Sequence, residues 1–181
     1  MKICVFCGSS TGFSPVFAEV AKNFGRLLAA QSITLVYGGG NVGLMGILAD
    51  AVMNEGGEVI GVIPEFLLQR EVGHRGITSL EIVHSMHQRK KRMADLADAF
   101  IALPGGWGTL EELAEVLTWK QLRLINQPVG VLNIDDFFAP LLAQMQLMAT
   151  HGFLKPDFMD LLHVDNSGEN LLQVISKRQV A

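Results

Sequence analysis

Basic charge, cysteine and long apolar runs are scarce in this 181-residue sequence. Its 14 Lys and Arg against 18 Asp and Glu give a net charge of −4, which argues against sequence-independent nucleic-acid binding. A local basic pocket for one anionic ligand is still compatible with that charge. No stretch approaches the roughly 18 continuous apolar residues of a membrane span, and no apolar segment followed by a cleavage site predicts a secretory signal. We therefore expect a cytoplasmic protein without a membrane or nucleic-acid partner.

The sequence also gives little support for a metal site. Cys4 and Cys7 form a CxxC, but they lie in an apolar run typical of a strand. Residues three apart on a strand point to opposite faces, so we expect two buried thiols in a reducing compartment. The five histidines show no HExxH or other ligand spacing, and we expect no metal.

Short apolar segments alternate with longer amphipathic ones, and 49% of the residues are hydrophobic. Segments so rich in Val and Ile are typical of strands buried on both faces of a parallel sheet. Strict strand–helix alternation therefore predicts a single α/β domain, residues 1–181, with a doubly wound parallel sheet and helices on both faces. The expected strands are Ile3–Cys7, Thr34–Tyr37, Glu58–Ile63, Glu81–His84, Ala99–Leu103, Val129–Asn133 and a short Leu161–Val164. The expected helices are Pro15–Gln31, Leu44–Asn54, Met86–Ala97, Thr109–Leu124, Phe137–Thr150 and Gly168–Lys177.

Three glycine-rich or polar loops follow expected strands, at residues 8–12, 38–46 and 104–109. Ligands of doubly wound sheets bind beyond the carboxyl ends of the strands, so these loops are candidate pocket walls. A longer excursion, residues 64–79, is either a lid or pocket wall or a solvated loop. The candidate wall residues are Gly8, Ser9 and Gly40.

The second loop, residues 38–43, satisfies GxGxxG between an expected strand and helix, which taken alone suggests NAD. Glu65, after the next strand, is placed where an acid could meet a ribose. However, the loop follows the second strand rather than the first, and the chain has no room for a separate substrate domain. Two interpretations stay open: ligand contact, and a glycine-lined turn that lets a helix pack closely on a strand.

The third loop, residues 103–112, reads LPGGWGTLEE and is the more specific pattern. Glycines let backbone N–H groups turn toward an anion, and a helix start adds partial positive charge. Thr109 is expected to cap this helix, and Glu112 would complete a capping box, which leaves a structural role for Glu112 open. No Lys follows the glycines, so this is not a Walker A loop.

The basic run at residues 86–93 reads MHQRKKRM. At about 100° per residue, Arg89 falls within the apolar stripe of this helix, and Lys90 falls on its edge. Lys91 and Arg92 point away. An inward cation is costly unless an anion meets it, so we favour Arg89 and Lys90 as ligand residues over purely structural pairing.

The helix expected after the third loop has apolar residues on more than one side. Leu113 and Leu117 lie on one side, and Val116 and Trp119 lie on another. Such a helix either packs against a second chain as well as its own sheet or is covered within its own domain.

Residues 86–93 and 104–112 resemble the paired motifs MHxRKxxM and PGGxGTxxE of the LOG ("lonely guy") family. Residues 37–46 also resemble that family's YGGGxxGLMG. The similarity runs from about residue 2 to residue 132 and matches every fixed motif position. Members of the family are cytokinin riboside 5′-monophosphate phosphoribohydrolases, many of them labelled "possible lysine decarboxylase".

The resemblance implies a Rossmann-like homodimer with active sites near the subunit interface and no cofactor. The implied reaction hydrolyses the N-glycosidic bond of a purine nucleoside 5′-monophosphate, a cytokinin nucleotide or AMP, to free base and ribose 5-phosphate. The resemblance implies that Arg89 and Glu112 are catalytic, with Glu111 as the backup for Glu112. The implied substrate-binding residues are Glu71, Arg89, Lys90, Gly105, Gly106, Trp107, Gly108, Thr109, Leu110, Glu111 and Thr118.

The implied chemistry agrees with the residue types. Cleavage of an N-glycosidic bond passes through an oxocarbenium-like sugar, which a carboxylate such as Glu112 can stabilise while it positions water. Arg89 could either stabilise the departing base or pair with the phosphate. The alternatives are a nucleotide- or cofactor-binding protein without turnover and a lysine decarboxylase, which would need pyridoxal phosphate on a lysine.

Overall fold

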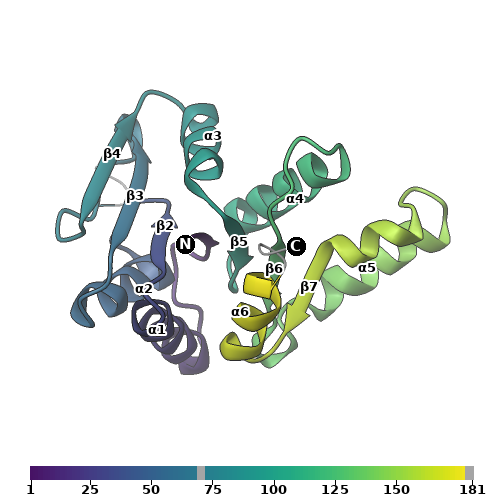
Figure 1. Ribbon diagram of the computed structural model, residues 1–181, viewed down its shortest axis with the longest axis horizontal. Helices are drawn as coiled ribbons and strands as arrows, with labels where there is room; N and C mark the ends of the chain where they lie inside the picture. The colour runs from purple at the N-terminus through teal and green to yellow at the C-terminus, as the bar shows by residue number, and fades with distance from the viewer. Residues whose placement is uncertain (69–71, 178–181) are drawn as a thin grey trace.

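The computed structural model describes residues 1–68 and 72–177, and within them seven strands form one parallel sheet in the order β4-β3-β2-β1-β5-β6-β7 (Figure 1). The strands are β1 (Lys2–Phe6), β2 (Thr34–Tyr37), β3 (Val59–Pro64), β4 (Ser79–Val83), β5 (Ala99–Ala102), β6 (Val129–Leu132) and β7 (Leu162–Asp165). The prediction of a doubly wound parallel α/β sheet is confirmed.

Helices cover both faces of this sheet (Figure 1). The helices are α1 (Pro15–Ala30), α2 (Gly43–Asn54), α3 (Met86–Leu96), α4 (Trp107–Gln121), α5 (Ala139–Thr150) and α6 (Gly168–Lys177). Short 3-10 turns lie at Glu65–Leu67, Ile134–Asp136 and Pro156–Leu161. Among the described residues, none of these helices combines the length and hydropathy needed to cross a membrane.

Two apolar cores lie on opposite faces of the sheet. One packs α1, α2 and α6 onto it, and the other packs α3, α4 and α5. Cys7 belongs to the first core and Cys4 to the second. Both thiols are free and buried, so the prediction from their spacing is confirmed.

The centre of the sheet is where the strand order reverses. β1 pairs with β2 on one side and with β5 on the other, so that Ile3 lies opposite both Leu35 and Ala99. The chain leaves β1 toward one face and β5 toward the other, which opens a crevice beyond their carboxyl ends. Ligands of such folds bind in this crevice.

The edge strand β4 is longer than expected, because it begins at Ser79 rather than Glu81. Ser79 and Ile82 are exposed, Ile82 to 58%, and the other three residues of the strand are partly buried. An edge strand lacks the continuous apolar run that identifies a central strand, so the sequence underestimates its length.

Candidate active site

Two loops meet through their backbones in the crevice between β1 and β5. The Gly8 N–H donates to the Pro104 carbonyl oxygen over 3.1 Å. A Cβ added at Gly8 would lie 3.3 Å from the Gly105 Cα and 3.0 Å from the Ser10 carbonyl oxygen. The loops can approach this closely because both carry glycine at the point of contact.

Helix α4 begins at Trp107, two residues before the predicted start. Gly106, in extended conformation, precedes the helix, and no side chain caps it. The predictions that Thr109 caps this helix and that Glu112 completes a capping box are therefore wrong. Thr109 instead lies in the first turn, 3% exposed, and a Cβ at Gly105 would lie 2.1 Å from its Oγ1. A helix start that no side chain caps keeps its N–H groups available to an anion.

Arg89 lies on the buried side of α3 and is only 5% exposed. Ser85 begins this helix, since its Oγ accepts from the Gln88 N–H over 3.2 Å. That start fixes the rotation of the helix and so aims Arg89 inward. The Arg89 Nε donates to the Val62 carbonyl oxygen over 3.1 Å, and Nη2 donates to the Gly38 carbonyl oxygen over 2.7 Å.

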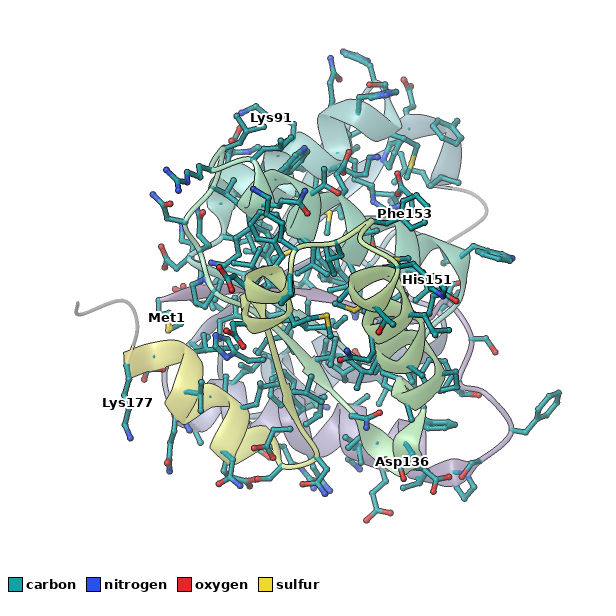
Figure 2. The ribbon with its side chains drawn as sticks, turned by 90° about the vertical axis from the view of Figure 1, so that its right-hand side faces the viewer. Met1, Lys91, Asp136, His151, Phe153 and Lys177 are labelled. Carbon is teal, nitrogen blue, oxygen red and sulfur yellow. The ribbon has the colours of Figure 1, made fainter. Side chains whose placement is uncertain are left out.

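The other two outer cations of this helix point away, as the helical periodicity predicts. The side chain of Lys91 is 71% exposed and pairs with Asp95 one turn later; Figure 2 shows Lys91 at the surface. Arg92 is 44% exposed and makes a two-pronged contact with Glu81 of β4, at 2.7 and 3.0 Å. The hydrogen bond from Arg92 lowers the pKa of the Glu81 carboxyl.

Arg89 and Glu112 line the same small cavity of about 90 Å³, together with Cys7, Gly38 and Thr109. Burial raises the pKa of the Cys7 thiol, and the negative charge of Glu112 raises it further. The same charge contributes to the raised pKa of Cys4. The two predicted catalytic residues therefore line one cavity of the crevice.

A second recess of about 180 Å³ adjoins this cavity, and both share Gly8, Ser9 and Gly106 as lining residues. Its outer wall contains Phe17 and Phe137, whose rings meet edge to face at 5.8 Å. Sequence reasoning missed both aromatics, because no motif or spacing relates positions 120 residues apart. Gly8 and Ser9, two of the expected wall residues, line both recesses.

Gly40, the third expected wall residue, is not among the described residues that line the two recesses. It pairs with Gly73 in an antiparallel bridge, and Gly38 reaches the cavity in its place. The Leu44 N–H, at the start of α2, donates to the Gly8 carbonyl oxygen over 3.0 Å. A Cβ at Gly43, whose φ is +59°, would lie 2.2 Å from the Ser9 carbonyl carbon. The GxGxxG loop thus serves close packing, and loop 8–10 fills the place that a dinucleotide phosphate would take.

Lys90 forms an ion-pair cluster between α3 and α4. Its ammonium contacts the Glu111 carboxylate closely and the Glu115 carboxylate at 3.1 Å. The hydrogen bond with Glu111 raises the pKa of Lys90. Lys90 and Glu111 therefore form an ion pair with each other, and neither side chain lines either of the two recesses.

Three further predicted substrate residues lie outside the recesses of their own chain. Trp107 is 88% exposed at the start of α4, and Leu110 packs against the core. Thr118 is exposed, and its hydroxyl donates to the Ala114 carbonyl oxygen over 2.7 Å. Glu71 lies outside the described residues.

A larger recess of about 1070 Å³ lies at the opposite end of the sheet beside Met1, Asp98 and Pro128. It contains none of the predicted site residues. The strands begin there, whereas ligands of this fold class bind where the strands end. We therefore place the candidate active site in the smaller crevice.

The fold and crevice define a doubly wound α/β protein with a helix start, a buried guanidinium and a carboxylate around one small site. The model of a family described as "Possible lysine decarboxylase" matches residues 45–175. The chain is 50% identical over 155 residues to the cytokinin riboside 5′-monophosphate phosphoribohydrolase of Rhodococcoides fascians, covering 85% of this chain and 78% of that one. It is 51% identical over 155 residues to LOG7 of Arabidopsis thaliana, which has the same name, covering 86% and 71%. The chain belongs to this LOG family.

Solved structures share the fold at lower sequence identity. The molybdenum cofactor carrier protein of Chlamydomonas reinhardtii superposes with a TM-score of 0.74 over 99% of this chain and 98% of that one, at 18% identity. Likeness at this level shows the architecture alone.

Proposed function

We propose that this chain hydrolyses the N-glycosidic bond of a purine nucleoside 5′-monophosphate and releases free base and ribose 5-phosphate. The observation that carries the proposal is the convergence of Arg89 and Glu112 in one cavity beside the uncapped start of α4. Relatives about 50% identical to this chain are named for this activity on cytokinin riboside 5′-monophosphates.

The 5′-phosphate binds at the start of α4 in this proposal. The backbone N–H groups of residues 105–109 and the helix dipole favour a dianion there. A Cβ at Gly105 would collide with Thr109, and the glycine keeps the loop backbone accessible to the phosphate. Fixing the phosphate holds the ribose C1′ in one place relative to Glu112.

Glu112 then stabilises the ribose while its bond to the base breaks. As the bond between C1′ and the base nitrogen breaks, the electron pair leaves with the base and positive charge develops on the sugar. A carboxylate beside C1′ stabilises that charge and orients water, whose oxygen adds to C1′ as one of its protons passes to the carboxylate. The departing base nitrogen takes up a proton from solvent, which gives the neutral free base. The Arg89 guanidinium supplies a fixed positive potential toward the departing base or the phosphate.

We propose that a second copy of this chain completes the site. Cavities of about 90 and 180 Å³ fall below the roughly 300–1,000 Å³ of typical small-molecule sites. Thr118 lies on the exposed side of α4, and Leu122 and Leu124 at the end of this helix are 60% and 68% exposed. A homodimer through this face buries those leucines and brings Thr118 toward the partner's site. The two free, buried thiols suit a reducing compartment such as the cytoplasm.

The residues do not fit the pyridoxal phosphate that a lysine decarboxylase needs. Among the described residues, no lysine lines either recess of the crevice. Lys90 is near but its ammonium is held by Glu111 and Glu115. We therefore assign no step to that cofactor.

A product assay tests the proposal. The protein is incubated with AMP, isopentenyladenosine 5′-monophosphate and the other nucleoside monophosphates, and free base is measured by chromatography. Release of a purine base supports the proposed hydrolysis. The substrate that is cleaved fastest shows which substituent on the base the enzyme prefers. Tight nucleotide binding without base release would favour the second candidate, a nucleotide-binding protein on the same fold.

A further inference from the structure

A buried histidine lies outside the cavity and has no part in the chemistry above. His74 is 5% exposed, and its Nε2 lies 3.0 Å from the Oδ1 of Asp50 on α2. Its Nδ1 accepts a hydrogen bond from the Gly76 N–H over 3.2 Å. Because Nδ1 is an acceptor, the ring proton is on Nε2 and is donated to Asp50.

The backbone around His74 runs alongside the second glycine-rich loop. The His74 N–H donates to the Gly39 carbonyl oxygen over 2.9 Å, and the Asn41 N–H donates to the Val72 carbonyl oxygen over 3.0 Å. Between these bonds, Gly40 and Gly73 form the antiparallel bridge. Residues 72–74 thus act as a short extra strand along residues 39–41.

This short strand holds a strained residue. Val72 has a φ of +45°, in the left-handed region that a β-branched side chain strongly disfavours. Such strain persists only where the surroundings over-determine the backbone, and it concentrates near functional sites. The bond from Asn41 and the anchoring of His74 supply that constraint here. Glu71, an implied substrate contact, directly precedes Val72 in the sequence.

The constraint extends to the candidate catalytic arginine. Gly38 directly precedes Gly39, and its carbonyl oxygen accepts from Arg89 Nη2 over 2.7 Å. A shift of Gly39 away from His74 would therefore move or rotate the Gly38 carbonyl. The guanidinium would then lose a carbonyl contact that helps to set its plane.

We infer that His74 is a positioning residue: paired with Asp50, it holds residues 72–74 against the loop at residues 38–41 and so fixes the Gly38 carbonyl that orients Arg89. The expected effect on kcat rests on the proposed function, whereas the expected effect on the position of the Arg89 guanidinium does not. His74 touches neither the substrate nor the reacting atoms.

The first test compares His74→Ala with His74→Gln and with His151→Ala as a matched control on an exposed histidine beyond α5 (Figure 2). A glutamine amide can still donate to Asp50. We expect His74→Ala to lower kcat for AMP about 10- to 100-fold with less than a threefold change in KM. His74→Gln should keep at least a third of wild-type kcat, and His151→Ala should leave kcat unchanged.

A second test asks whether the effect passes through Arg89. In an Arg89→Lys background the fork that contacts Gly38 is gone, so adding His74→Ala should lower kcat by less than twofold. Asp50→Ala should match His74→Ala, and the double variant should be no worse than either. Independent, full effects of His74→Ala and Arg89→Lys would overturn the inference.

The third readout needs no turnover, so it stands even if AMP is not a substrate. The Nε–H of Arg89 donates to Val62 inside the protein, and its NMR signal can be assigned by its loss in Arg89→Lys. We expect this signal to shift and to exchange faster with solvent in His74→Ala, at a temperature where the variant is still folded. An unchanged signal in the folded variant would reduce His74 to a stabilising residue and contradict the inference.

Discussion

Arg89 on α3 and Gly38 at the end of β2 are 51 residues apart in the sequence, yet the guanidinium Nη2 donates to the Gly38 carbonyl oxygen over 2.7 Å. The Nε of the same side chain donates to Val62 in β3. Two contacts from one planar fork fix its orientation, which a lysine ammonium could not match. The crevice therefore contains a positively charged guanidinium that is held in one orientation.

The first prediction contrasts two neighbouring arginines. Arg89→Ala should reduce the rate of base release about 10²-fold or more, because the variant loses the oriented charge. Arg92→Ala should stay within about twofold of wild type and lose at most about 1 kcal/mol of stability, as expected for an exposed pair with Glu81. Steady-state kinetics and urea unfolding measure both. Equal losses of activity would mean that the two side chains share one role.

Glu112→Gln keeps the size of the side chain but removes its charge. We expect kcat to fall about 10²-fold or more while AMP binding, measured by calorimetry, changes little, since the lost interaction forms mainly in the transition state. Glu111→Gln is the matched control one residue away, and it should have the smaller effect. If Glu111→Gln were the more damaging substitution, the catalytic role would pass to Glu111.

The phosphate site predicts how substrates are discriminated. Charge-assisted hydrogen bonds are worth about 1.5–3 kcal/mol each, and several at the start of α4 would also position C1′. Adenosine should therefore be cleaved far more slowly than AMP, and ribose 5-phosphate should inhibit whereas ribose should not. Similar kcat/KM values for adenosine and AMP would contradict binding of phosphate by this loop.

Gly105→Ala tests the contact between the loop and the first turn of α4. The new Cβ would lie 2.1 Å from the Thr109 Oγ1 and 2.9 Å from the Gly8 nitrogen. We expect a loss of about 1–3 kcal/mol in the free energy of unfolding, as for other overpacked sites, measured by urea titration. Gly108→Ala is the control, because a Cβ there meets nothing within 4 Å. A fully stable Gly105→Ala variant would show that the loop relaxes without cost.

The two cysteines give a prediction about pH. Burial raises the pKa of both the Cys4 and Cys7 thiols, so the folded protein should not react with a thiol reagent at pH 8, whereas the unfolded chain should react at two sites. Above the ordinary thiol pKa, only the unfolded state loses these protons. Stability should therefore be intact below about pH 8.5 and decline as the pH rises further, which urea titrations between pH 7 and 10 would show. Rapid labelling of the native protein would contradict this.

The sequence predicts the sheet, the inward orientation of Arg89 and the burial of both cysteines, because each depends on the periodicity of one helix or strand. Helical periodicity separates Arg89 from Arg92, and strand periodicity separates Cys4 from Cys7. The sequence does not predict the start of α4, because glycine can begin a helix without a capping side chain whereas the pattern favours Thr109 as the cap. Phe17 reaches the crevice only through tertiary packing.

Other parts of the site depend on which partner a side chain meets in three dimensions. The helical phase places Lys90 at the edge of the buried stripe, but it does not show that Glu111 and Glu115 meet its ammonium. The GxGxxG motif predicts a close backbone approach at Gly43, but it does not show that the approaching group is loop 8–10 rather than a ligand.

The central place of β1 has a consequence for how the protein is made. The Lys2 N–H donates to the Asp98 carboxylate, 96 residues further along the chain, and β1 finds its second neighbour only in β5. During synthesis the first four strands emerge while one edge of β1 is unpaired, and an apolar unpaired edge invites association with other chains. The crevice does not exist until β5 and the start of α4 have left the ribosome. Nascent chains therefore pass through a stage in which they can aggregate but have no crevice for a ligand to stabilise, and the speed of translation from β1 to β5 sets how long that stage lasts.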